Sequence, residues 1–294
     1  MSSAADNNSS LNSVSPASSE VLSSKLVLVA ASAKLLPELT ARLQIMGAVV
    51  IPFPVLQARE LEDRTALDQA ITRLDQYDWI IFTSAYGVTF FDRRLRELAR
   101  YAKDAPRVCA IGPATGMAAR DCGFSVALTA TKFIAEGVMA SLEQYHGGKA
   151  NLKGLRILIP RAVEAREFLP EALAGAGCHV DIVPCYQTIR PEPDRELVAR
   201  LHAEIPDLIV FTSAKTVRNF WKTTAAIVGE ERTQQLLHQA VIAVIGPITG
   251  EAVREHGKTA CIIPAESTVT ALCDAIRKFF LKTQGEEFGC PGFD

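Results

Sequence analysis

The fold of this chain is indicated by a stretch that occurs twice. Residues 79–88 read WIIFTSAYGV, and residues 208–217 read LIVFTSAKTV. Each copy is a short apolar run followed by Thr-Ser and then by helical spacing, which is typical of a buried strand that leads into a helix. Strands that are apolar throughout belong to parallel sheets with helices on both faces. The stretch therefore predicts parallel α/β structure in both halves of the chain.

Other segments repeat in the same order. AIGPATG at residues 110–116 returns as VIGPITG at residues 244–250, and the opening segment 28–54 has a fainter counterpart at 158–184. Between these motifs, Val- and Ile-rich runs alternate with segments of helical spacing. Two such units predict an α/β protein with two doubly wound parallel-sheet domains of the flavodoxin or Rossmann type. The repeats alone divide the chain near residue 150.

The composition of the chain limits the kinds of partner that it can bind. With 31 Lys and Arg against 33 Asp and Glu, the net charge of −2 provides no field for a phosphate backbone, so nucleic acid is not expected. The apolar runs are too short to span a membrane, and we expect a cytoplasmic protein. Residues 1–24, which are rich in Ser, and residues 284–294 are expected to be a disordered and a frayed tail.

The metal-binding residue types are scattered. The seven cysteines include no CxxC pair, and the five histidines lack the i, i+4 spacing of a metal-binding helix. We therefore expect no metal and no cofactor. The odd number of cysteines and their apolar neighbours favour thiols over disulfides.

The repeated motifs follow strands, where open α/β sheets bind ligands. Their hydroxyls either only cap the helices or leave backbone N–H groups that hold an anion. The candidate ligand-binding residues in these motifs are Thr83, Ser84, Gly112, Pro113, Ala114, Thr115, Thr212, Ser213, Ala214, Lys215, Gly246, Pro247, Ile248 and Thr249.

Three further candidates lie between the repeats. Arg161 and Arg166 follow a predicted strand, and they are either solvated surface residues or cations that bind carboxylates. Tyr186 follows the strand that ends one unit. It either packs at an interface or offers a hydroxyl to the ligand.

Taken together, the motifs resemble those of the uroporphyrinogen-III synthase family over residues 25–280. The resemblance rests on order and spacing, because no single motif is specific. The motifs that carry it are Phe-Thr-Ser at 82–84 and 211–213, Ile-Gly-Pro at 111–113 and 245–247, Val-Pro-Cys-Tyr-Gln-Thr at 183–188, and Ala-Glu-Ser-Thr at 265–268.

The resemblance implies a different division of the chain. One domain would comprise residues 25–54 and 192–283 and the other residues 61–184, joined by two crossing linker strands at 55–60 and 185–191. The implied substrate is hydroxymethylbilane, a linear tetrapyrrole with eight carboxylates that is handed over by the preceding enzyme of the pathway. The implied reaction removes water, inverts the last pyrrole ring and closes the macrocycle. Tyr186 would assist departure of the hydroxyl, and helix N-termini would hold the carboxylates.

One segment departs from the family pattern. Many bacterial members have Thr-Arg-Pro after the first strand, where this chain has Ala30-Ala31-Ser32-Ala33, so Lys34 is the candidate replacement for the cation. The alternatives to an enzyme are a two-lobed tetrapyrrole- or anion-binding or sensor protein, and a catalytically silent relative in which Ala31 and Ile248 mark lost contacts.

Overall fold

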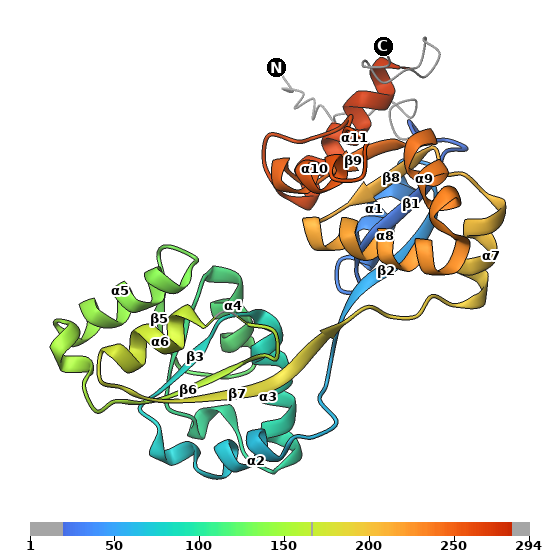
Figure 1. Ribbon diagram of the computed structural model, residues 1–294. Coiled ribbons are helices and arrows are strands. Elements are labelled where there is room, and N and C mark those ends of the chain that lie inside the picture. The colour runs from blue at the N-terminus through green and yellow to red at the C-terminus, as the bar shows by residue number, and fades with distance from the viewer. Residues whose placement is uncertain (1–19, 166, 284–294) are drawn as a thin grey trace, which may run out of the picture. The chain divides into compact units, whose positions relative to one another are not determined.

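The computed structural model of the chain describes residues 20–165 and 167–283 and divides into two units. Unit 1 comprises the described residues up to Gln57 and those from Arg190 onward, and unit 2 comprises Ala58–Ile189 (Figure 1). Each unit has parallel strands that alternate with helices, so the predicted α/β class and its two-part organisation are confirmed. A cut near residue 150 would separate strands of unit 1 that pair with one another.

Unit 1 contains a four-stranded parallel sheet. Its strands, in sheet order, are β2 (Val49–Arg59), β1 (Leu26–Ser32), β8 (Leu208–Phe211) and β9 (Val241–Val244). Its helices are α1 (Leu36–Ile45), α7 (Arg195–Ala203), α8 (Ala214–Val228), α9 (Glu230–Gln239), α10 (Pro247–Arg254) and α11 (Val269–Lys282).

Both faces of this sheet are covered, because β8 and β9 are apolar and buried at every position and β1 is so from Val27 to Ala31. Val27 and Val29 of β1 pack with α1 and α11, whereas Leu28 and Ala30 pack with α7, α8, α9 and α10. Successive residues of a strand point to opposite faces, so one continuous apolar run supplies two cores. Trp221 of α8 stacks on His256, with ring centroids 4.4 Å apart.

Unit 2 contains a five-stranded parallel sheet. In sheet order its strands are β5 (Val126–Thr129), β4 (Arg107–Ala110), β3 (Trp79–Phe82), β6 (Arg156–Ala162) and β7 (His179–Ile189). Its helices are α2 (Thr65–Thr72), α3 (Ala85–Glu97), α4 (Pro113–Asp121), α5 (Ala135–His146) and α6 (Phe168–Gly175).

The helices of unit 2 also cover both faces. Ile80 and Phe82 of β3 pack with α2, α3 and α4, and Trp79 and Ile81 pack with α5 and α6 (Figure 1). Trp79 is fully buried, and its Nε1–H donates to His146 Nε2 at 3.1 Å.

Each sheet has one point where the direction of winding reverses. In unit 2 the chain builds β3, β4 and β5 outward and then returns to place β6 and β7 on the other side of β3. In unit 1 the same reversal falls between β1 and β8. At such points the loops at the carboxyl ends of two central strands diverge to opposite faces and leave a crevice for a ligand.

The structure corrects the sequence predictions in two places. Residues 20–24, which were assigned to the disordered tail, form a turn in which Val21 and Leu22 join the core of unit 1. Cys261 is disulfide-bonded, so the expectation of thiols is wrong there, whereas Cys109, Cys122, Cys178, Cys185 and Cys273 are free. Cys261 is only partly buried, unlike most of these thiols.

The predicted tails at 1–19 and 284–294 lie outside the described residues. Within the described part of the chain, no helix combines the length and the hydropathy that a membrane span needs.

Candidate functional site

The carboxyl ends of β3 and β6 meet at the reversal point of unit 2. Thr83 and Ser84 leave β3, and their side chains point to different sides because successive extended residues alternate. Thr83 lines a cavity together with residues of α5 and α6. Ser84 turns instead toward α3 and Tyr186. Thr83 and Ser84 are adjacent in the sequence but contribute to two different neighbouring sites.

Ser84 links the start of α3 to Tyr186. Its Oγ accepts the backbone N–H of Gly87 at 2.9 Å and lies 2.9 Å from Tyr186 Oη. A hydroxyl carries one proton and two lone pairs, so Ser84 can cap the helix and still hydrogen-bond to Tyr186 in either direction. The two residues are 102 positions apart, and the sequence named both without indicating that they touch.

An aromatic cluster holds the ring of Tyr186. The ring stacks on Phe90, with centroids 5.4 Å apart and planes 12° apart, and its centroid lies 5.8 Å from that of Tyr86. Tyr186 is 7% exposed, and burial raises the pKa of its phenol, although the hydrogen bond to Ser84 lowers it somewhat. The phenol therefore keeps its proton at neutral pH and can donate a hydrogen bond.

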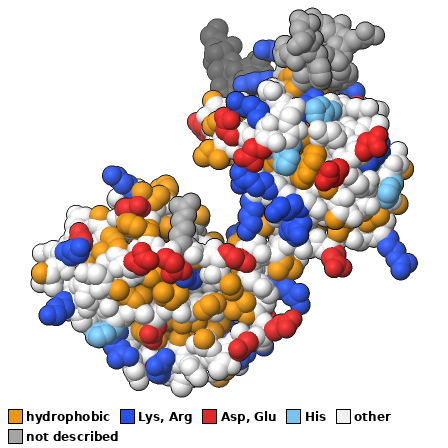
Figure 2. Space-filling view, viewed as in Figure 1, with side chains coloured by type: hydrophobic (Ala, Val, Ile, Leu, Met, Phe, Trp, Pro, Cys, Tyr) orange, Lys and Arg blue, Asp and Glu red, His pale blue; other side chains and the backbone are white. Residues whose placement is uncertain are grey.

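A cavity of about 410 Å³ opens on the other side of β3 and β6. Most of its lining is apolar, and Phe133 and Phe168, which are 63% and 47% exposed, form part of it. Apolar side chains gather on the visible face of unit 2, and acidic side chains border them (Figure 2). The remaining lining residues are Thr83, Ile111, Ile134, Ala135, Glu136, Ile159, Arg161, Ala165, Leu169 and Pro170.

Arg161 supplies a positive charge to this cavity. Its side chain is 9% exposed and pairs with Glu167, whose side chain is 57% exposed. The interpretation of Arg161 as a solvated surface residue is therefore wrong. Arg166, which was predicted to act with it, lies outside the described residues.

The Gly-Pro loop of unit 2 borders the same cavity. Gly112 is the N-cap of α4 and Pro113 its first residue, and a Cβ atom on Gly112 would lie 3.1 Å from Cδ1 of Phe133. The glycine thus leaves room for the Phe133 ring. Pro113 and Ala114 are exposed, whereas Thr115 is only 6% exposed and presents little of its hydroxyl to a ligand.

In unit 1 the second Thr-Ser motif forms a closed cap. Ser213 Oγ accepts the N–H of Thr216 at 3.2 Å, and Thr216 Oγ1 accepts the N–H of Ser213 at 3.1 Å. Thr212 is buried and Ala214 is half-buried, while Lys215 is exposed in the first turn of α8. A cation thus stands where the repeat in unit 2 has Tyr86.

The second Gly-Pro loop meets the Ala-Glu-Ser-Thr stretch. Gly246 is the N-cap of α10, Pro247 follows it, and a Cβ on Gly246 would clash with Ser267 Oγ. Ile248 is 77% exposed and Thr249 only 4%. Thr115 and Thr249, whose hydroxyls were expected to face a ligand, are therefore both buried.

The departure from the family pattern lies at the reversal point of unit 1. Ala30 and Ala31 are buried in β1, Ser32 and Ala33 are half-buried, and Lys34 is exposed just beyond the strand. The small side chains therefore place no charge at the end of β1, and Lys34 is the cation that follows it.

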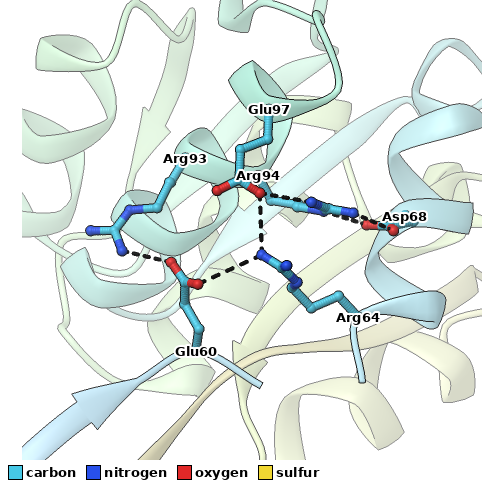
Figure 3. A network of polar contacts seen from close by, with 6 residues as sticks. All are labelled: Glu60, Arg64, Asp68, Arg93, Arg94 and Glu97. Atoms are coloured by element: carbon cyan, nitrogen blue, oxygen red, sulfur yellow. Dashed lines mark hydrogen bonds and ion pairs between the residues drawn. The ribbon is translucent and has the colours of Figure 1, made fainter. Parts of the chain in front are cut away.

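A network of ion pairs ties α3 to α2 and to the end of β2 (Figure 3). Arg94 binds both carboxylate oxygens of Asp68 at 2.6 Å and holds the pKa of that carboxyl below its usual range. Such two-point pairs order side chains more firmly than single contacts do. The network joins the end of β2 and α2 to α3, and its members are Glu60, Arg64, Asp68, Arg93, Arg94 and Glu97.

The sequence matches a known family over most of its length. A family model described as uroporphyrinogen-III synthase HemD matches residues 37–274. The chain belongs to the uroporphyrinogen-III synthase family. Membership makes it an enzyme, a cyclising lyase of haem biosynthesis.

Individual relatives agree with this assignment. The chain is 31% identical over 235 residues to a putative uroporphyrinogen-III synthase of Methanothermobacter thermautotrophicus, covering 78% of this chain and 88% of the relative. It is 30% identical to the uroporphyrinogen-III synthase of Synechococcus elongatus, covering 88% and 97%.

Solved structures support the fold. A uroporphyrinogen-III synthase mutant from Thermus thermophilus aligns with a TM-score of 0.56 at 17% identity, covering 88% of this chain and all of that one. The Helicobacter pylori protein aligns with a TM-score of 0.54 at 16% identity, covering 87% and 99%.

Sequence reasoning missed several residues of this family member's candidate site. Phe90 follows Tyr86 by four positions on α3, so helical spacing was an available signal for the aromatic cluster. Phe133, Phe168 and Glu167 have no like residue at the matching positions of the other repeat, where Ile263, Glu38 and Pro37 stand. Their approach to Arg161 and Gly112 depends on loop geometry.

In the described part of the chain, no group of three His, Cys, Asp or Glu side chains lies close enough to hold a metal ion.

Proposed function

We propose that this chain cyclises hydroxymethylbilane to uroporphyrinogen III, with Tyr186 as the group that protonates the departing hydroxyl. The observation that carries the proposal is the Tyr186–Ser84 pair at the reversal point of unit 2. The phenol is protonated, held by its ring and connected through Ser84 to a helix N-terminus. These properties suit a proton donor whose position has to be exact to a fraction of an ångström.

The substrate supplies most of the driving force. The pyrrole nitrogen pushes out the terminal hydroxyl, which takes a proton and leaves as water, and an azafulvene remains. A substituted carbon of the last ring attacks this electrophile and forms a spiro intermediate. The bond between that carbon and the methylene bridge to the third ring then breaks, the bridge bonds instead to the other α carbon of the last ring, and loss of a proton from this carbon restores the aromatic ring. The protein's task is to hold the two ends together, which can be worth many powers of ten in rate.

Binding of the carboxylates is assigned to both units in this proposal. In unit 1 the first turns of α8 and α10 and the Lys215 ammonium offer donors and positive charge. In unit 2 the first turns of α3 and α4 and the Arg161 guanidinium do so. We also propose that the enzyme is cytoplasmic and takes its unstable substrate directly from the preceding enzyme.

The test is an assay with freshly generated hydroxymethylbilane in which the III and I isomers are separated. The uncatalysed reaction gives the I isomer, so product identity reports catalysis independently of rate. The proposal expects mostly the III isomer. A protein that binds the tetrapyrrole but leaves only the I isomer would be the catalytically silent relative, and the proposal would be wrong.

A further inference from the structure

The cavity of unit 2 combines an apolar body with one buried charge. Its walls come from Phe133, Ile134, Phe168 and the ends of β3, β4 and β6. Among the described lining residues, Arg161 is the one cation, and Glu136 is an acidic residue at the rim. The volume of about 410 Å³ lies at the lower end of the range for small-ligand sites, so the cavity has room for one substituted ring and not for a whole tetrapyrrole.

The two partners of the Arg161–Glu167 pair are unequally buried. The Arg161 side chain is 9% exposed, whereas the Glu167 side chain is 57% exposed. A guanidinium cannot shed its proton, so Arg161 is a permanent cation inside the cavity and requires an anion. The Glu167 side chain can rotate away from Arg161 toward the solvent at a small cost in free energy, because more than half of its surface is already hydrated.

Backbone geometry leaves the Glu167 side chain available for this contact. Glu167 occupies the N-cap of α6, but its side chain makes no capping hydrogen bond to that helix. It contacts Arg161, which lines the cavity, instead. Releasing Glu167 therefore would not uncap α6.

We propose that Glu167 is an internal carboxylate that occupies Arg161 in the free protein and is displaced by a ligand carboxylate. The ligand class is a five- or six-membered aromatic ring that carries a short carboxyalkyl chain. The ring lies between Phe133 and Phe168, and its carboxylate replaces that of Glu167 on Arg161. This inference rests on the proposed function in one respect, since a pyrrole of the substrate would be the natural ligand.

The size of the effect follows from competition. An ion pair with one half-exposed partner is closed roughly 1.5 to 5 times as often as it is open. The apparent affinity of a ligand is reduced by the open fraction, so removing the competitor should tighten binding about 2- to 6-fold.

The experiment uses 3-phenylpropionate as the probe and titrates it into the full chain by calorimetry. Glu167→Gln should bind the probe about 2- to 6-fold more tightly than the wild type. Glu171→Gln, on the same helix and with the same change of charge, should bind it like the wild type. The uncharged 3-phenylpropanamide should bind weakly to all three proteins, because it cannot replace a carboxylate on Arg161.

Unchanged or weaker binding of the probe by Glu167→Gln would overturn the proposal, as would equal binding of the acid and the amide. Arg161→Met should lose binding of the acid, and because the acid–amide comparison uses only the wild type, the inference does not depend on the folding of that variant. The isomer assay separates the two claims. A wild type that makes no III isomer contradicts the proposed function, while the probe titrations still decide the role of Glu167.

Discussion

The sequence Thr-Ser-Ala leads into α3 of unit 2 and into α8 of unit 1, but its side chains make different contacts in the two units. In unit 1 the hydroxyl of Ser213 is engaged in a closed capping box with Thr216. In unit 2 the hydroxyl of Ser84 caps α3 singly and also contacts Tyr186. Where unit 1 has Lys215, unit 2 has Tyr86 in an aromatic cluster. The comparison shows that a repeated fold can keep its backbone while its side chains serve separate tasks.

The difference extends to the Gly-Pro loops. Gly112 leaves room for the ring of Phe133, and Gly246 leaves room for the hydroxyl of Ser267. The loop of unit 2 therefore borders an apolar cavity, whereas the loop of unit 1 lies against a serine. In the proposed function unit 2 holds the reacting ring and both units bind carboxylates, and the first three experiments below test how the two units differ.

The largest effect is expected for Tyr186→Phe. The variant keeps the ring stacked on Phe90 but loses the proton donor, and a hydrogen bond to a developing charge is worth about 1.5–3 kcal/mol. The rate of III-isomer formation should fall roughly 10- to 150-fold. The exposed Tyr101→Phe is the matched control and should stay at the wild-type rate. A stable Tyr186→Phe with an unchanged rate would reduce Tyr186 to a packing residue.

The next effect distinguishes the two caps. Ser84→Ala and Ser213→Ala should each lower the free energy of unfolding by about 1 kcal/mol, because each removes an N-cap. Only Ser84→Ala should also slow the III-isomer rate, by about 5-fold, through the lost contact with Tyr186. Chemical denaturation and the isomer assay measure the two quantities separately. Equal losses of activity would mean that the units do not differ in this respect.

A smaller effect is expected for Lys215→Gln. Lys215 is an exposed cation that, in the proposed function, binds a carboxylate of the substrate. Its removal should raise KM about 2- to 5-fold and leave kcat unchanged. The increase in KM should be smaller at high salt, because dissolved ions then screen the attraction between Lys215 and the carboxylate beyond roughly 3–8 Å. Lys222→Gln, farther along α8, is the control. If it raises KM as much as Lys215→Gln does, the effect is one of overall charge and not of the helix start.

The smallest effect is expected for metal removal. Neither repeat contains a ligand motif for zinc or iron, so dialysis against a chelator should leave the rate and the isomer ratio unchanged. Activity that is lost on chelation and restored by zinc or iron would contradict this.

The strands were predictable because burial on both faces leaves a continuous apolar run. Trp79–Phe82 and Leu208–Phe211 have the predicted bounds. β2 runs on through Pro52 and Pro54, although proline is unfavourable inside a central strand. The N–H of Val49 donates to Lys25 in front of β1, so odd-numbered residues of β2 turn their N–H groups toward β1. Pro52 and Pro54 are even-numbered, so the N–H groups that they lack would point away from β1. The hydrogen bonds between β1 and β2 are therefore unaffected by the two prolines.

The candidate site was predictable only where the motifs repeat. Ser84 and Ser213 follow strands in both halves, so their place at strand ends could be read from the sequence. The contact of Ser84 with Tyr186 could not, because it depends on β3 and β7 flanking β6 in one sheet. The approach of Glu167 to Arg161 depends on a loop whose course no periodicity encodes.

The two tryptophans of the chain are divided between the two units, and this has a spectroscopic consequence. Trp79 is sealed in the core of unit 2 against His146, whereas Trp221 lies half-buried on His256 in unit 1. Burial lowers the pKa of His256, so its imidazole stays neutral at neutral pH and becomes charged, beside the Trp221 indole, only in acid. The intrinsic fluorescence of the protein is therefore the sum of two local reporters. Replacing either tryptophan by phenylalanine would leave an optical signal that belongs to one half of the molecule alone.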